Sequence, residues 1–508
     1  MTNTAAPLDR DQDPRRWFAL VVIAIASLMV VLDASIVNIA LPKAQAALHI
    51  SFANRQWIVT AYTLTFGGLL LLGGRIADYA GRKRVFIIGL IGFALASALG
   101  GAAPDQGLLF AARGLQGAFG AILAPAALSL ISVTFTDSKE RARAFGVYGA
   151  ISGVGAAIGL IMGGVLTQYL SWRWCLFVNI PMALIAVVLA IPNIRESRLS
   201  GKTKYDVPGA LLSTIGFVAI VYGINEAATP GHGWSSPVTI WCLVVGVLLL
   251  VAFVAYEARA KNPLLPLGVI LDRVRGGSLL SQFFTASGLF GMFLFLTYYF
   301  QSVHGYSPIR AGFAFLPFSI GIIVSATAAS NLLPKVGPRL LGVVGSVMAA
   351  GGLFYLSFIT ATSSYVGAVL PAMIIMSLGL GLAFVTIAST SLFNVRHDES
   401  GVASAVLNTS QQIGGSLGTA IFNTIAISAT AAYAASHVWH GGALPPGVSP
   451  PDAATHGFTV AFKLGAGCLG VAALIFGFFV NVDRHHLAQH DDVTEPELAP
   501  HENPAIQE

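Results

Sequence analysis

The stretch WFALVVIAIASLMVVLDASIVNIAL, residues 17–41, decides the class of fold. Its 25 residues carry a single charge, Asp33, and an α-helix needs about 20 mostly apolar residues to cross the hydrocarbon core of a bilayer. A secretory signal peptide is the alternative, because Arg15 and Arg16 precede the run and Ala44-Gln45-Ala46 resembles a cleavage site. The apolar core of a signal peptide is only about 7–15 residues long. We therefore expect an uncleaved first transmembrane helix.

Further apolar runs of similar length follow this first one along the whole chain. They lie near residues 56–74, 85–103, 108–134, 144–166, 174–192, 208–225, 238–256, 277–300, 311–332, 340–359, 365–392, 402–429 and 458–480. Charged residues make up 10% of the 508 and hydrophobic residues 55%, whereas soluble proteins are roughly 25% charged. This composition excludes a soluble globule and a disordered chain. A barrel is also excluded because nothing alternates in polarity. The sequence predicts an all-α integral membrane protein with 14 transmembrane helices.

The positions of Lys and Arg orient these helices. If the N-terminus lies inside, the outside loops contain four of the 28 basic residues, namely Lys43, Arg55, Arg173 and Arg310. Arg113 and Lys463 fall within spans, and all the others lie in inside segments. Basic residues concentrate in cytoplasmic loops, so we expect an inner (plasma) membrane protein with both termini cytoplasmic. The same rule explains the net charge of +5 without a nucleic-acid partner.

An internal repeat divides the spans into two sets. Residues 74–83 (GRIADYAGRK) resemble residues 330–339 (SNLLPKVGPR), so that Gly81 matches Gly337. Spans one to six and nine to fourteen then form equivalent units with the same orientation, a plan known from transporters. The predicted domains are an N-terminal six-helix bundle at 1–192, a linker with two inserted helices at 193–275, a C-terminal six-helix bundle at 276–483 and a disordered cytoplasmic tail at 484–508.

Two charged residues lie deep within predicted spans. Asp33 is the only acid well inside a span and Arg113 the only base, with Gln116 one turn further on the same helix face. Charges at that depth are costly and mark coupling or transport sites by default. We predict that Asp33 and Arg113 couple transport to protons. The alternatives are an acid that only hydrogen-bonds a neighbouring helix, and an arginine that only ties two helices together.

The loop between the second and third spans is a candidate conformational latch. Its residues Asp78, Arg82 and Lys83 can bond to neighbouring helix ends at the cytoplasmic face, and Gly81 can take a positive φ in a tight turn that begins near Gly74. We expect these ties to break when the two halves rock. Part of the basic charge serves as a topology anchor in any case.

Small residues line one face of two predicted spans, which lets neighbouring helices approach closely. They are Gly155, Gly159, Gly163 and Gly164 in the fifth span and Gly414, Gly415 and Gly418 in the thirteenth. Tight packing alone would explain the pattern. We predict in addition that these faces form a sliding seam between the halves. A dinucleotide-binding loop at 153–159 is excluded, because the third glycine comes one place late and no strand precedes it.

Aromatic and amide side chains outline a candidate substrate cavity. Neutral amides between aromatic walls would suit bulky, amphipathic or cationic ligands, although lipid-facing positions explain many single Phe residues. The predicted cavity residues are Asn38, Tyr62, Gln116, Phe290, Phe293, Tyr298, Asn408, Gln411 and Gln412.

Other chemistry has little support in the sequence. Cys175, Cys242 and Cys468 lie far apart in apolar runs, which is typical of free thiols packed in helices. His485, His486 and His490 could bind metal, but a solvated tail explains them as well. We therefore expect no metal, no cofactor, and no enzyme or receptor activity, since the chain has no P-loop, no HExxH motif and no long soluble segment.

Several of these motifs together resemble the major facilitator superfamily, in particular its fourteen-helix drug:proton antiporter branch. The first-helix motif is similar to residues 32–42 (LDASIVNIALP), the loop signature to 74–83, the fourth-helix motif to 113–117 (RGLQG) and the antiporter motif to 155–164. Residues 172–174 (WRW), 177–181 (FVNIP) and 401–418 resemble further branch features. The similarity therefore covers nearly the whole transmembrane region.

Two departures from the family pattern bear on function. Leu160 stands where the antiporter motif usually has Pro, and Tyr79 where the loop signature usually has Arg. The first departure weakens the case for antiport, and the second weakens one gating tie. Because the C-terminal half has no acid within a span, a coupling carboxylate must be Asp33 or a boundary acid such as Glu226.

The resemblance implies a monomeric, proton-driven efflux transporter that exports amphipathic drugs or related small molecules by alternating access. The alternative is a dedicated exporter of a single metabolite, antibiotic or lipid with the same fold. A membrane enzyme or receptor is the third class, which the missing motifs disfavour.

Overall fold

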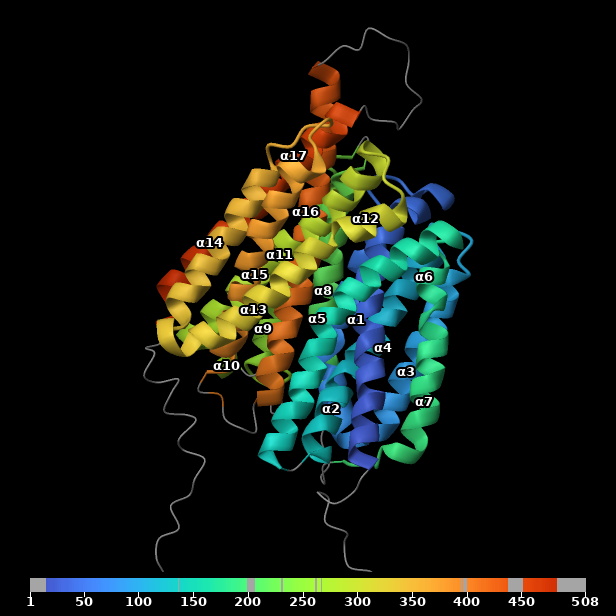
Figure 1. Ribbon diagram of the computed structural model, residues 1–508, viewed down its shortest axis with the longest axis vertical. Coiled ribbons are helices and arrows are strands. Elements are labelled where there is room, and N and C mark those ends of the chain that lie inside the picture. The colour runs from blue at the N-terminus through green and yellow to red at the C-terminus, as the bar shows by residue number, and fades with distance from the viewer. Residues whose placement is uncertain are drawn as a thin grey trace, which may run out of the picture.

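The computed structural model describes residues 15–135, 137–198, 206–229, 232–260, 263–265, 267–393, 395, 400–436 and 451–481, and all regular structure among them is helical (Figure 1). The N-terminal unit consists of α1 (Arg15–Ala47), α2 (Trp57–Ala80), α3 (Arg82–Gly101), α4 (Gln106–Thr134), α5 (Ser138–Tyr169), α6 (Trp174–Phe177) and α7 (Asn179–Asn193). The insert consists of α8 (Val207–Glu226) and α9 (Pro237–Glu257). The segment predicted as a tail lies outside the described residues.

The C-terminal unit follows the short helix α10 (Leu267–Leu271). It consists of α11 (Arg273–Tyr298) with the π-helical turn η2 (Tyr299–Val303), α12 (Pro308–Ala314), α13 (Leu316–Val336), α14 (Pro338–Leu356), the π-helical turn η3 (Tyr365–Val369), α15 (Leu370–Ser391), α16 (Ser400–Ser436) and α17 (Pro451–Phe479).

The structure agrees with the predicted membrane class. Thirteen helices among the described residues are long and apolar enough to cross a bilayer, and α5 adds a shorter apolar stretch, Val154–Tyr169. The helices begin and end where local chemistry dictates, because side chains such as Asp105 accept a hydrogen bond from an otherwise unpaired backbone N–H at a helix start. The predicted tenth span is broken at Phe315 into α12 and α13.

The two repeated turns have the same backbone geometry. Gly81 has φ +112° and Gly337 has φ +88°, values that a residue with a Cβ rarely adopts. Each glycine ends one helix and begins the next without a linker, α2 to α3 and α13 to α14. The positive φ predicted for Gly81 is confirmed.

The helices group into two packed units with α8 at their junction. Helices α1 to α7 pack on one another, as do α11 to α17, and the two groups lie side by side (Figure 1). Contacts between the groups run mainly through α2 against α16 and α5 against α12 and α13. Helix α8 packs on both α2 and α16, whereas α9 packs mainly on α8.

The glycine faces lie mostly inside the units and not between them. A Cβ at Gly155, Gly159 or Gly163 would meet Leu28, Ser35 or Ile36 of α1, all within the N-terminal unit. Gly414, Gly415 and Gly418 face Phe283, Phe290 and Ser287 of α11 in the same way. The prediction of a sliding seam is therefore wrong for these residues, and tight packing is the observed role.

Two positions do bring the units into close contact. A Cβ at Gly164 would lie 2.7 Å from Ile309 Cα across the junction. On α2, a Cβ at Gly67 would lie 2.8 Å from Gln412 Cβ of α16. Sequence spacing could not separate these positions from their neighbours because a glycine face does not show which helix it meets.

Candidate functional site

A closed polar network lies inside the N-terminal unit around Asp33. Arg113 Nη1 donates to Asp33 Oδ2 at 2.6 Å, and the side chains of Asp33 and Arg113 are 0% and 1% exposed. Arg113 also donates through Nε to the carbonyl of Ile58 at 2.9 Å and through Nη1 to Gln116 Oε1 at 2.8 Å. The two deep charges predicted from the sequence thus form a buried ion pair.

The second oxygen of Asp33 is satisfied by amides from two other helices. Gln116 Nε2 donates to Asp33 Oδ1 at 3.0 Å, and Asn179 Nδ2 donates to the same atom at 2.8 Å. Both amides also donate to Ser97 Oγ at 2.8 Å. The Asp33 carboxylate therefore accepts three hydrogen bonds, one on Oδ2 from Arg113 and two on Oδ1 from the amides.

Sequence reasoning missed Ser97 and Asn179 as members of this network. Asn179 lies within the quoted stretch 177–181, so a polar residue in an otherwise apolar run was the available signal. Ser97 gave no signal, because a single serine in an apolar helix commonly bonds its own backbone. Here its Oγ instead donates to the carbonyl of Leu176 at 2.9 Å.

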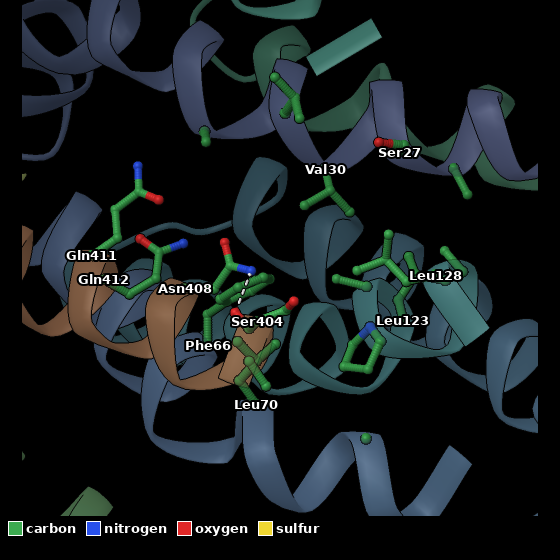
Figure 2. Close-up of a pocket in the computed structure, with 18 of the residues that line it drawn as sticks. Ser27, Val30, Phe66, Leu70, Leu123, Leu128, Ser404, Asn408, Gln411 and Gln412 are labelled. Atoms are coloured by element: carbon green, nitrogen blue, oxygen red, sulfur yellow. Dashed lines mark hydrogen bonds between the residues drawn. The ribbon is translucent and has the colours of Figure 1, made fainter. Parts of the chain in front are cut away.

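A cavity of about 950 Å³ lies between the two units. Asn408, Gln411 and Gln412 reach it from α16, facing Ser27 and Val30 of α1 across the open space (Figure 2). Among the predicted substrate residues, those that line the cavity are Asn38, Tyr62, Phe290, Phe293, Asn408, Gln411 and Gln412.

Two predicted cavity residues lie elsewhere. Gln116 is fully buried in the Asp33 network. Tyr298 is buried at the other end of the bundle, where its hydroxyl donates to Gln45 Oε1 at 2.6 Å and its ring lies under the Arg55 guanidinium. Their polar groups are already satisfied inside the protein, and the prediction is corrected for both.

The amides of the cavity present their oxygen atoms to it. Asn408 Nδ2 donates to the carbonyl of Ser404 at 3.0 Å (Figure 2). Asn38 Nδ2 donates to the carbonyl of Ala34, also at 3.0 Å, and no donor to either Oδ1 is found among the described residues. Gln412 Oε1, in contrast, is buried and has no hydrogen-bond partner among the described residues. Arg113 lines the cavity, whereas Asp33 lies behind it. The cavity therefore offers hydrogen-bond acceptors on apolar and aromatic walls, with one deep positive charge.

The cavity extends to the end of the bundle at which Gly81 lies. Gly74, Asp78 and Arg82 of the predicted latch line it there, and Arg82 Nη2 lies 2.7 Å from Asp78 Oδ1. Glu196 accepts from the backbone N–H groups of Lys83 and Arg84 at 3.1 and 3.2 Å, an acceptor that the sequence analysis missed. All these bonds stay within the N-terminal half, so none of them crosses the opening.

The opposite end of the bundle is closed by bonds between the units. Arg55 Nε donates to Asn423 Oδ1 at 3.1 Å, and Gln301 Nε2 donates to the carbonyl of Ile39 at 2.9 Å. Arg55 is only 2% exposed, and Tyr298 bonds Gln45 beside it. The cavity is thus open at the Gly81 end and sealed at the Arg55 end.

Comparison with known proteins places this geometry in context. The family model described as Major Facilitator Superfamily matches residues 23–419. The puromycin resistance protein pur8 of Streptomyces alboniger is 50% identical over 469 residues, which cover 91% of each chain. The cephamycin export protein CmcT of Amycolatopsis lactamdurans is 37% identical, over 84% of this chain and 88% of that protein.

A solved structure shares the fold at low sequence identity. A bacterial homolog of the human lysosomal transporter Spinster, in an inward-facing and unoccupied conformation, superposes with a TM-score of 0.64. It is 15% identical, and the match covers 94% of this chain and 98% of that one.

Proposed function

The chain belongs to the Major Facilitator Superfamily, and from this premise we propose that it exports amphipathic small molecules by alternating access. The observation that carries the proposal is the cavity of about 950 Å³ between the units, open at one end and sealed at the other. The two relatives described above are named for antibiotic resistance and antibiotic export, which supports an outward direction of transport.

The distribution of Lys and Arg assigns the two ends of the bundle. The Gly81 end carries most of the basic loop residues and faces the cytoplasm of the plasma membrane. The conformation is then inward-open, ready to take a substrate from the cytoplasm or from the inner leaflet. Rocking of the units would break the bonds of Arg55 and Tyr298 and close the cavity near Asp78.

Proton coupling rests on Asp33 and Arg113. A proton that reaches Asp33 Oδ2 neutralises the carboxylate and removes the partner of Arg113. The charge of Arg113 then faces the cavity uncompensated, which weakens the binding of a cationic substrate. The proton binds from the outside when the cavity is open outward and leaves to the cytoplasm when it is open inward, which restores the ion pair. One proton then moves inward as the substrate moves outward. The transporter works as a monomer without a cofactor.

A dedicated exporter of one compound is the second candidate. It is favoured by the relative at 50% identity, whose name refers to resistance to a single antibiotic, puromycin. A screen of puromycin and chemically unrelated dyes separates the two candidates, because a dedicated carrier moves few of them.

Inverted membrane vesicles test the proposed coupling. Addition of a transported compound should drive proton movement with the wild-type protein and not with Asp33→Asn. Glu226→Gln tests the other candidate carboxylate, which pairs with His232, and it should keep the wild-type proton movement. Equal proton movement in wild type and Asp33→Asn would remove Asp33 from the mechanism, whereas absence of transport in the wild type would count against export itself.

A further inference from the structure

Two buried carboxyl groups face each other where the inserted hairpin begins and ends. Asp206 precedes α8 and is 6% exposed, and Glu257 ends α9 and is 3% exposed. Each has one oxygen bound by a backbone N–H. Gly209 N donates to Asp206 Oδ1 at 2.9 Å, and Leu265 N donates to Glu257 Oε2 at 3.2 Å.

The remaining oxygen of each carboxyl group has no donor. Asp206 Oδ2 and Glu257 Oε1 are both buried without a hydrogen-bond partner. A Cβ built on Gly209 would lie 2.7 Å from Asp206 Oδ2 and 2.6 Å from Glu257 Oε1. Both oxygens therefore lie next to the position that a side chain at Gly209 would take. Two ionised carboxylates that flank one point repel each other, and a proton on one of them relieves this repulsion.

The described neighbours of the pair include one other titratable group and one arginine. Among the described residues, neither Asp206 nor Glu257 forms an ion pair with Lys, Arg or His. Tyr256 is the other titratable group that faces the pair, and its hydroxyl is close enough to hydrogen-bond the Asp206 carboxyl. From α2, Arg75 approaches this region, but it donates to the carbonyl of Pro263 at 2.6 Å.

A short segment connects the pair to the mouth of the cavity. The backbone N–H of Leu265 donates to Glu257. Leu264 lines the cavity and is 3% exposed. The carbonyl of Pro263 accepts from Arg75, which also lines the cavity. Residues 263–265 therefore form a strap that is bound to the acid pair on one side and to the N-terminal unit on the other.

We propose that Asp206 and Glu257 form a second proton-binding site, which holds the strap at the cytoplasmic mouth of the cavity when a single proton is shared between them. The carboxylic O–H of one residue donates to the carboxylate of the other. When the proton leaves to the cytoplasm, the two carboxylates repel each other, Glu257 turns away from Asp206, and its carboxylate moves out of reach of the Leu265 N–H. The site does not depend on the proposed export, because it would bind its proton even if Asp33 played no part in coupling.

Infrared spectroscopy of the full chain in liposomes tests the site through the C=O band of a protonated carboxylic acid. The wild type should show this band at neutral pH, and D206N and E257Q should each lose it, because the remaining carboxylate then accepts from the new amide. Glu226→Gln and D33N are the matched controls that should retain it. A band that persists in both D206N and E257Q, or that disappears only in D33N, would overturn the proposal.

Two further measurements distinguish the site from a merely structural contact. Gly209→Ala should displace the carboxyl groups and shift loss of the band to lower pH, whereas Gly268→Ala, whose Cβ meets nothing within 4 Å, should leave it unchanged. Amide exchange at Leu265, corrected for its intrinsic pH dependence, should rise about two- to tenfold above the titration point in the wild type and stay flat in E257Q. No rise in the wild type would contradict the strap.

Discussion

The two six-helix units share a turn but differ in the chemistry that they bury. Both repeat their glycine turn with positive φ, at Gly81 and Gly337. The N-terminal unit buries the Asp33–Arg113 ion pair, whereas no Asp or Glu is buried among the described residues of the C-terminal unit. The C-terminal unit contributes neutral amides such as Asn408 and Gln412 to the cavity. This division suggests that the N-terminal unit binds the proton and that the C-terminal unit recognises the substrate.

The largest expected effect follows from breaking the ion pair. Arg113→Ala leaves the Asp33 carboxylate buried without its cation, and loss of one partner of a buried pair costs about 3–5 kcal/mol. A lower thermal midpoint in detergent would measure this cost. Arg275→Ala is the matched control, because its pair with Asp272 is partly exposed. Equal melting of the two variants would contradict the view that the N-terminal unit depends on its buried charge.

Two adjacent glycines sharpen the contrast between packing within a unit and packing between units. Gly163→Ala would clash with the backbone of Ile36 in the same unit, and Gly164→Ala with the backbone of Ile309 across the junction. Overpacking costs about 1–3 kcal/mol in either case. We expect Gly163→Ala to lower stability, and Gly164→Ala to open the Arg55 end.

Chemical labelling of a cysteine placed at Ala53 measures the opening of the Arg55 end, because this residue is 6% exposed there. Labelling should increase in Gly164→Ala and not in Gly163→Ala. The same labelling in both variants would show that the two glycines do not separate the two kinds of contact.

Substitution of the amides should weaken substrate binding without loss of proton coupling. Asn408→Leu removes an acceptor, at a cost of about 0.5–1.5 kcal/mol, or roughly two- to tenfold in affinity. Asn331→Leu is the control, since this exposed amide bonds its own helix away from the cavity. If Asn408→Leu abolished proton release and spared affinity, the division between the units would be wrong.

The smallest effect concerns the closed end. Tyr298→Phe removes the hydroxyl that donates to Gln45 and keeps the ring beneath Arg55. One neutral hydrogen bond is worth about 1 kcal/mol, so the population of the sealed state should fall by a few fold. Distances between spin labels on α1 and α11 measure that population, and an unchanged distribution would remove this bond from the seal.

The sequence identified the charged residues within spans, but it missed the neutral polar residues that bond to them. Asp33 and Arg113 are recognisable because charges in apolar runs are costly. Ser97 and Asn179 belong to residue types that satisfy themselves locally in most helices, so their convergence needs the tertiary structure. Glycine spacing predicted close packing at Gly159 but not its partner on α1. Likewise, Asp206 and Glu257 lie at opposite ends of the insert, and only the α8–α9 hairpin brings them together.

Proton release on substrate binding tests the central claim most directly. Purified protein in weakly buffered detergent is mixed with a compound that the transport screen identifies, and a pH-sensitive dye records the protons released. The wild type should release protons, and Asp33→Asn should bind the compound with no release. Proton release of equal size from Asp33→Asn would contradict the assignment of the proton to the N-terminal unit.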